Sequence, residues 1–131
     1  MNFPTITLKT GVRIMTRPVL SEELPPEFQQ DQPPGQPAVH LNFNECCDIA
    51  ATLKGRLPTE AEWREAFAAK PYNGGIVEWT ASHENANVIV RSGSWGSSWI
   101  NSTEGCHAAL SDAERPVVRC KIVGFRLAFD P

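Results

Sequence analysis

The chain has 131 residues, of which 41% are hydrophobic and 21% charged, and its formal net charge is −3. This length and composition are typical of one globular domain that buries a core of its own. The acidic balance, without a cluster of Lys or Arg, argues against nucleic-acid binding, and the sequence lacks the apolar run of roughly 18–20 residues that spans a bilayer.

The N-terminus lacks the charged and apolar regions of a signal peptide, so we expect a cytoplasmic location and no membrane insertion. The cysteines do not have the spacing of a zinc site. We expect free thiols in a reducing compartment, with a bridge between Cys106 and Cys120 as the alternative. The other two cysteines are the adjacent pair Cys46 and Cys47.

The first predicted element is a β-hairpin. Apolar and polar residues alternate in TITLKTGVRIMTR, residues 5–17, around a turn at Thr10 and Gly11. Residues 20–39 follow and contain five prolines. Proline removes hydrogen-bond donors and fixes φ, so this Pro-rich stretch is predicted to be a long surface loop within the single domain 1–131.

A helix is predicted over residues 42–54. Asn42 or Asn44 can cap its start, and Gly55 can end it in the left-handed conformation. Apolar residues recur at helical spacing and predict one buried stripe, namely Cys46, Ile49, Ala50 and Leu53. Cys46 is therefore expected to fill the core rather than to do redox chemistry.

The segment RLPTEAEWREAFAAK predicts a second helix. Thr59 and Glu62 have the T-x-x-E spacing of a capping box, in which each side chain bonds to the other residue's amide. Trp63 begins an apolar face that continues three and four residues later. Pro71 ends the helix.

After residue 71 the pattern changes to short apolar runs separated by Gly, Ser and Asn, which is typical of strands. The runs are GGIVEWT, NVIVRSGSW and VVRCKIVGFRLAF. With two helices before them and strands at both ends of the chain, the sequence predicts an α+β domain with short antiparallel sheets. The N-terminal and C-terminal strands are expected to pair and bring the termini close together.

Four motifs occur in order: RLPTEAEW at 56–63, a loose match to G-N-x-W-E-W-T at 75–80 with Gly75 in place of Asn and Val77 in place of Trp, RSGSW at 91–95 and GFR at 124–126. This order resembles the formylglycine-generating enzyme family, also called the sulfatase-modifying factor family, over about residues 37–128. The resemblance implies a single C-type lectin-like domain with two helices. A fold of this kind does not by itself fix a function.

The motif residues suggest structural roles. Glu78 lies beside Trp79 and is expected to be held by hydrogen bonds or by a cation. Arg126 alternates out of phase with its apolar neighbours and is expected to pair with a carboxylate such as Glu62 or Glu78. Gly124 is expected to allow a close backbone approach or a turn. In the related enzymes a calcium site lies near the second motif, so Glu78 is also a candidate ligand for Ca²⁺, although no cofactor is required.

Catalysis is not expected. Oxidases of this family hold copper with two cysteines, three and eight residues after the serine that is Ser94 here, and soft thiolates suit Cu(I). Ser97 and Ser102 stand at those positions. An iron-dependent branch uses histidine ligands, but His40, His83 and His107 show no ligand spacing in this chain.

The resemblance extends to the variable proteins of diversity-generating retroelements, which include phage proteins and display ligand contacts between the last two motifs. Residues 96–107 are small and polar with one aromatic anchor, a composition typical of binding surfaces. We expect a non-catalytic module that binds a protein or other macromolecular ligand and is cytoplasmic or virion-associated. The alternatives are a relative or remnant of the oxidase and a small phage-encoded inhibitor of a host protein. The candidate ligand-binding residues are Ser97, Ser98, Trp99, Asn101, Ser102, Glu104 and His107.

Overall fold

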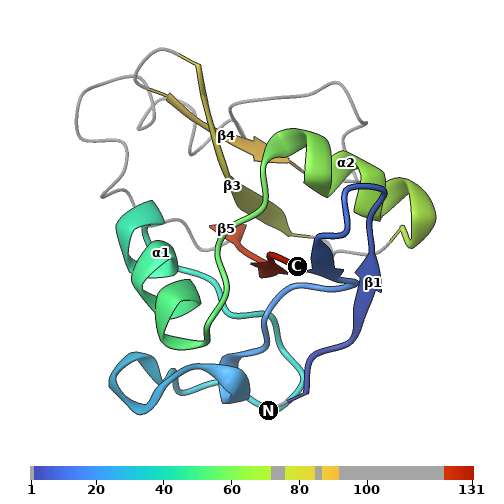
Figure 1. Ribbon diagram of the computed structural model, residues 1–131. Helices are drawn as coiled ribbons and strands as arrows, with labels where there is room; N and C mark the ends of the chain where they lie inside the picture. The colour runs from blue at the N-terminus through green and yellow to red at the C-terminus, as the bar shows by residue number, and fades with distance from the viewer. Residues whose placement is uncertain (1, 72–75, 85–86, 92–122) are drawn as a thin grey trace.

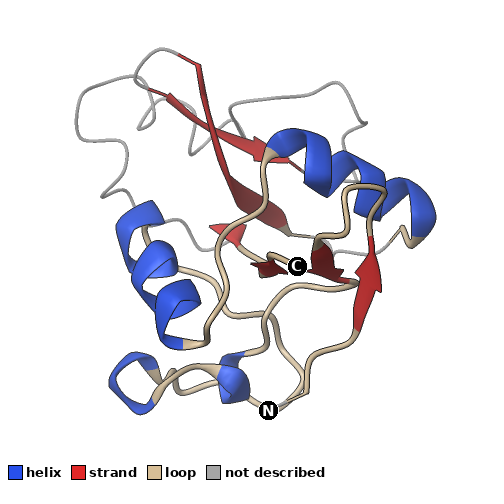
Figure 2. Cartoon of the chain, viewed as in Figure 1, coloured by secondary structure: helices blue, strands red, loops and turns tan. Residues whose placement is uncertain are grey.

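The described residues form a small α+β arrangement with two α-helices and two three-stranded sheets (Figure 1). Figure 2 shows both helices flanking the strands. This confirms the predicted α+β class. The computed structural model describes residues 2–71, 76–84, 87–91 and 123–131.

The first sheet joins the two ends of the chain. Strands β1 (Thr5–Thr7) and β2 (Arg13–Met15) form the predicted hairpin, and Gly11 in its turn has a φ of 90°, which glycine adopts without strain. Strand β6 (Ala128–Phe129) pairs with the other edge of β2. The predicted pairing of N-terminal and C-terminal strands is therefore confirmed.

The second sheet has the order β4–β3–β5. Strand β3 (Val77–Glu84) pairs with β4 (Asn87–Arg91) in an antiparallel hairpin and with β5 (Val123–Gly124) in parallel. The expectation of purely antiparallel sheets was therefore wrong. A parallel pair needs a crossover connection, and residues 92–122, which separate β4 from β5, supply the length for one.

Both helices begin where the sequence predicts. Helix α1 (Phe43–Thr52) is capped by Asn42, which forms a capping box with Glu45. Helix α2 (Glu60–Ala69) has the predicted box between Thr59 and Glu62. Lys54, and not Gly55, adopts the left-handed conformation after α1, with a φ of 68°.

Gly55 has a different role. A Cβ atom there would lie 2.9 Å from the Ala128 carbonyl oxygen and 2.9 Å from the Phe129 ring. The glycine therefore allows the turn after α1 to approach β6 closely.

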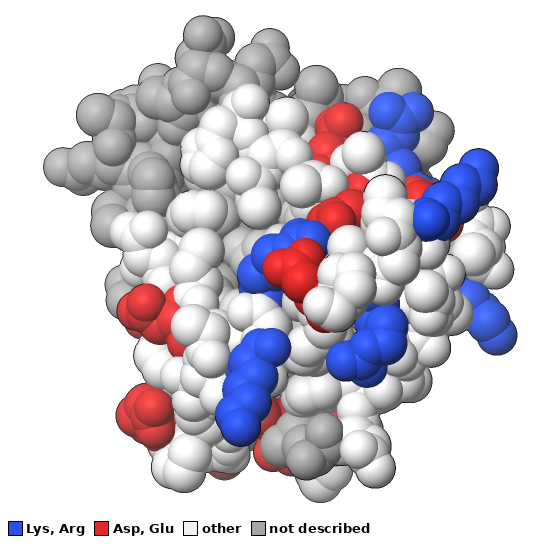
Figure 3. Space-filling model, in the orientation of Figure 1, with Lys and Arg blue, Asp and Glu red and all other residues white. Residues whose placement is uncertain are grey.

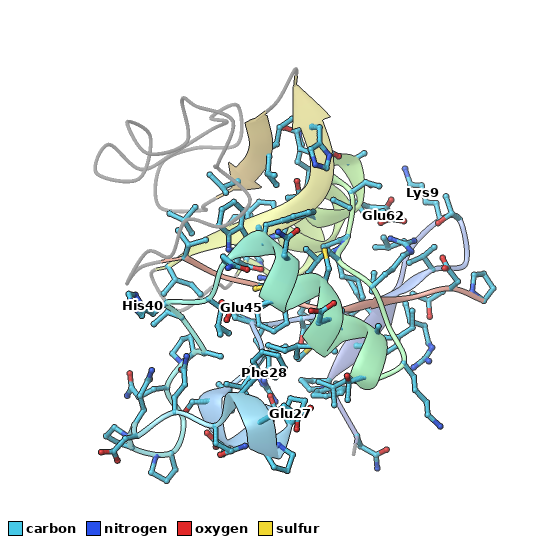
Figure 4. The ribbon with its side chains drawn as sticks, turned by 90° about the vertical axis from the view of Figure 1, so that its left-hand side faces the viewer. Lys9, Glu27, Phe28, His40, Glu45 and Glu62 are labelled. Atoms are coloured by element: carbon cyan, nitrogen blue, oxygen red, sulfur yellow. The ribbon has the colours of Figure 1, made fainter. Side chains whose placement is uncertain are left out.

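The Pro-rich stretch 20–39 is more ordered than a plain surface loop. It contains two short 3₁₀ helices, η1 (Ser21–Glu23) and η2 (Pro26–Phe28). Leu24 is buried, and Phe28 packs against the core beside α1 (Figure 4). The stretch therefore covers one side of the core, while residues 33–36 within it are exposed.

The main core lies between the second sheet, α1 and the covering loop. It contains Ile49, Trp79 and Phe125, with Cys46 fully buried among them. The expected core role of Cys46 is confirmed. No helix in the described ranges is long and apolar enough to cross a membrane.

Candidate functional site

Strand β3 carries both ends of the segment that contains the predicted binding residues. Glu78 pairs with Arg91, the last residue of β4, on one side and with Gly124 of β5 on the other. Strands β4 and β5, which flank residues 92–122 in the sequence, therefore lie on opposite edges of β3 (Figure 1). One strand therefore fixes the positions of Arg91 and Val123, the described residues on either side of 92–122.

A buried ion pair holds β3 against the C-terminal segment. Arg126 donates from Nε to one carboxylate oxygen of Glu78 at 2.7 Å and from a terminal nitrogen to the other at 2.8 Å. Both side chains have an exposed fraction of 0%. This bidentate geometry is the strongest form of Arg–carboxylate contact, and it answers the open choice between Glu62 and Glu78.

Arg126 also reaches two other elements. Its guanidinium donates to the Met15 carbonyl oxygen in β2 at 3.1 Å and lies 5.6 Å from the centre of the Trp63 ring in α2. A cation over an indole face is favourable, especially where water is excluded. One side chain thus ties together both sheets and α2.

The residues that follow Glu78 fix β3 from its two sides. The Trp79 indole donates to the Leu41 carbonyl oxygen at 3.0 Å, and the Thr80 hydroxyl donates to the Ile89 carbonyl oxygen at 2.7 Å. Phe43 packs edge-on against the Trp79 ring, with centroids 6.0 Å apart. We call β3, β4 and β5 together with Arg126 the frame. Its buried polar groups make it well suited to hold one geometry.

The predicted ligand-binding residues lie outside the described residues. They are Ser97, Ser98, Trp99, Asn101, Ser102, Glu104 and His107. The described structure positions the strands on either side of them and says nothing further about their side chains. The binding role of residues 96–107 therefore stays a prediction.

Glu78, the candidate calcium ligand, has both oxygens bonded to Arg126. A calcium ion at this carboxylate would have to compete with the guanidinium for the same oxygens. Among the described residues no group of three or more His, Cys, Asp or Glu side chains is placed to hold a metal ion. His40 and His83 are both exposed, before α1 and in β3 respectively.

Sequence reasoning missed a second charged group around Arg56. Its guanidinium donates to both oxygens of Glu62 at 2.8 Å and, from the other side, to Asp130 at 2.9–3.2 Å. Asp130 comes from the far end of the chain, and the paired backbones of Arg56 and Ala128 bring it near Arg56. Hydrogen bonds from Arg56 lower the pKa of Glu62 and the pKa of Asp130.

Because Arg56 holds two carboxylates, we expect the folded chain to lose stability in acid. The pKa of Glu62 is below its ordinary value of 4.5 in the folded chain. The ionised carboxylate therefore contributes fully to the free energy of unfolding above about pH 4.5, and this contribution is lost as the pH falls through the folded pKa. Glu62→Gln should lower the free energy of unfolding by roughly 1 kcal/mol at pH 7, since the pair is partly exposed. Urea unfolding of the wild type and of Glu62→Gln at pH 7, 5 and 3 should show the difference in their free energies of unfolding shrinking toward zero.

Glu27 provides the matched control, because it is exposed on η2 and makes no ion pair with another described residue (Figure 4). Glu27→Gln should leave the free energy of unfolding unchanged at each pH. A difference for Glu62→Gln that stays constant from pH 7 to pH 3 would show that its charge does not matter.

Comparison of the sequence with protein families finds no matching family model, and comparison with curated proteins finds no match. Functional inference therefore depends on the geometry of the frame and on the motifs in the sequence.

Proposed function

We propose that this chain is a non-catalytic binding module of C-type lectin-like architecture, in which the frame presents residues 96–107 to a protein or other macromolecular ligand. The observation that supports the proposal is the pairing of the two flanking strands with opposite edges of β3, where Arg91 and Gly124 both lie opposite Glu78. A presenting surface binds more tightly when its supports are already ordered, because less conformational entropy is lost on binding.

The composition of the presented residues also favours binding. Ser97, Ser98 and Asn101 are small polar side chains that adapt to different hydrogen-bonding partners. Trp99 supplies a large aromatic surface, the type of residue that most often dominates binding energy. This segment also lacks the two thiolates needed for copper, since serines stand at both positions, Ser97 and Ser102. We therefore propose a module that needs no cofactor, and a phage or retroelement variable protein is the class it most resembles.

The test uses a loop-replaced variant, in which residues 96–107 become a Gly/Ser sequence of equal length, together with Trp99→Ala. Proteins captured by the wild type from a cell lysate are identified by mass spectrometry, purified, and measured individually for binding by surface plasmon resonance. We expect the loop-replaced variant to unfold cooperatively near the wild-type midpoint but to lose binding. Trp99→Ala should weaken binding by about 30-fold, the size of a typical hot-spot loss.

Lys9→Gln serves as the control, because Lys9 is exposed in the β1–β2 turn, away from β3 (Figure 4). It should bind like the wild type. Equal affinity of the wild type and the loop-replaced variant for every purified protein would refute the proposal. Tight, stoichiometric binding of Cu(I) without oxygen, followed by oxygen-dependent turnover of a thiol peptide, would instead establish the oxidase alternative.

A further inference from the structure

A polar hollow of about 260 Å³ lies where the turn after α1 meets the C-terminal strand. Its cationic side chains are Arg13, Lys54 and Arg56, and Asp130 is the only acidic side chain among the described residues that line it. The three cations come from β2, from the turn after α1 and from the residue that bridges to β6. Figure 3 shows basic and acidic side chains interspersed on the face where the chain ends, within a protein whose net charge is −3.

Backbone hydrogen bonds fix the three segments that supply these cations. Arg13 is in register with Phe129 in the first sheet. Arg56 and Ala128 exchange two backbone bonds of 2.9 and 2.7 Å. The amides of Lys54 and Gly55 donate to carbonyl oxygens of α1, which closes the helix end. The cations therefore project from an ordered backbone and not from loose chain ends.

The three cations differ in their partners. Every nitrogen of Arg56 already donates to Glu62, Asp130 or the Leu57 carbonyl oxygen. Arg13 and Lys54 are exposed and form no ion pair with a described residue. The Arg13 guanidinium lies 5.1 Å from the centre of the Phe129 ring, a contact that leaves its N–H groups free to donate in the plane.

Asp130 is held less firmly than Arg56. Its side chain is 66% exposed, and Arg56 is its only bonded partner among the described residues. An exposed carboxylate of this kind can turn away into water at little cost. An incoming anion could then take its place beside Arg56.

We propose that this hollow binds a phosphate group, free or carried by a larger ligand, through the side chains of Arg13 and Lys54, with Asp130 as an internal competitor for the site. A phosphate dianion carries enough charge to engage both cations, and guanidinium and ammonium groups are its usual partners in proteins. The site is separate from residues 96–107 and does not depend on the proposed binding function.

The test is a titration of the ¹⁵N-labelled chain followed by NMR at constant ionic strength, with inorganic phosphate in one arm and O-phosphoserine in the other. We expect saturable shifts of the Gly55, Arg56 and Phe129 amides. Saturation by both compounds identifies a free-phosphate site, and saturation by phosphoserine alone identifies a site for a carried phosphate.

Three variants test the assignment. Arg13→Gln and Lys54→Asn should each weaken binding by about tenfold, the loss expected for one charge-assisted contact. Asparagine tolerates the left-handed backbone at position 54, so this variant should keep the fold. Asp130→Asn should strengthen binding about threefold by removing the competing charge. Lys9→Gln is the matched loss of one exposed cation elsewhere.

Shifts that rise linearly without saturation would overturn the proposal. It would also be overturned if Lys54→Asn and Lys9→Gln had the same effect, since that result would reduce the site to general charge attraction. An Asp130→Asn variant that binds more weakly than the wild type would show that Asp130 helps to build the site instead of competing for it.

Discussion

Replacing Arg126 with methionine is expected to lower the free energy of unfolding by about 3–5 kcal/mol, the usual cost of removing one partner from a buried ion pair. The variant would leave the Glu78 carboxylate with no exposure to water and without the two hydrogen bonds that compensate its burial. It would also remove the bond to Met15 and the contact with Trp63. Denaturant unfolding monitored by tryptophan fluorescence measures the loss.

A double variant separates the charge from the packing. Glu78→Met combined with Arg126→Met removes both charges and keeps apolar volume, so it should be more stable than the Arg126→Met single variant. If the single variant lies within 1 kcal/mol of the wild type, the ion pair is not what joins the two sheets. If the double variant equals the sum of the two single losses, the two side chains act independently.

Gly124→Ala is expected to lower the free energy of unfolding by about 1–3 kcal/mol, the usual cost of overpacking. A Cβ atom at this position would lie 2.6 Å from the Ala38 carbonyl oxygen and 2.6 Å from Cδ1 of Ile76. Both distances are too short for van der Waals contact, and the carbonyl oxygen belongs to the backbone. Since Gly124 pairs with Glu78, the strain would fall directly on the frame.

Ile76→Val tests this explanation, because valine lacks the Cδ1 atom that meets the new methyl group. The variant with both substitutions should lose less stability than the sum of the two single losses, which thermal or denaturant unfolding of all four proteins can measure. Strict additivity would mean that the side chain of Ile76 is not involved. Wild-type stability in Gly124→Ala would mean that the close approach to residue 38 is not required.

The helices could be predicted because their signals are local. Thr59 and Glu62 form a capping box within one turn, and the buried stripe of α1 follows from helical spacing alone. The hairpin at Gly11 is equally local. The left-handed residue after α1 was assigned wrongly, because Gly55 is needed for its contact with Ala128, which lies far away in the sequence.

The charged contacts could be predicted only in part. That Arg126 needs a carboxylate follows from its place in the apolar run GFRLAF, but the choice between Glu62 and Glu78 depends on which strand lies beside it. Glu62 is bonded to Arg56 instead. The parallel pairing of β5 and the position of Asp130 also depend on tertiary packing, which no local pattern records.

Strands β4 and β5 pair with opposite edges of β3, and both lie opposite Glu78. The distance that the chain must span between Arg91 and Val123 is therefore set by the sheet and not by the residues in between. Closing a longer flexible connection between two fixed anchors costs little more entropy, about 0.6 kcal/mol for each doubling of its length. Grafted sequences of varied length and composition should therefore be accommodated here without unfolding the domain. The chain offers a starting scaffold for combinatorial libraries.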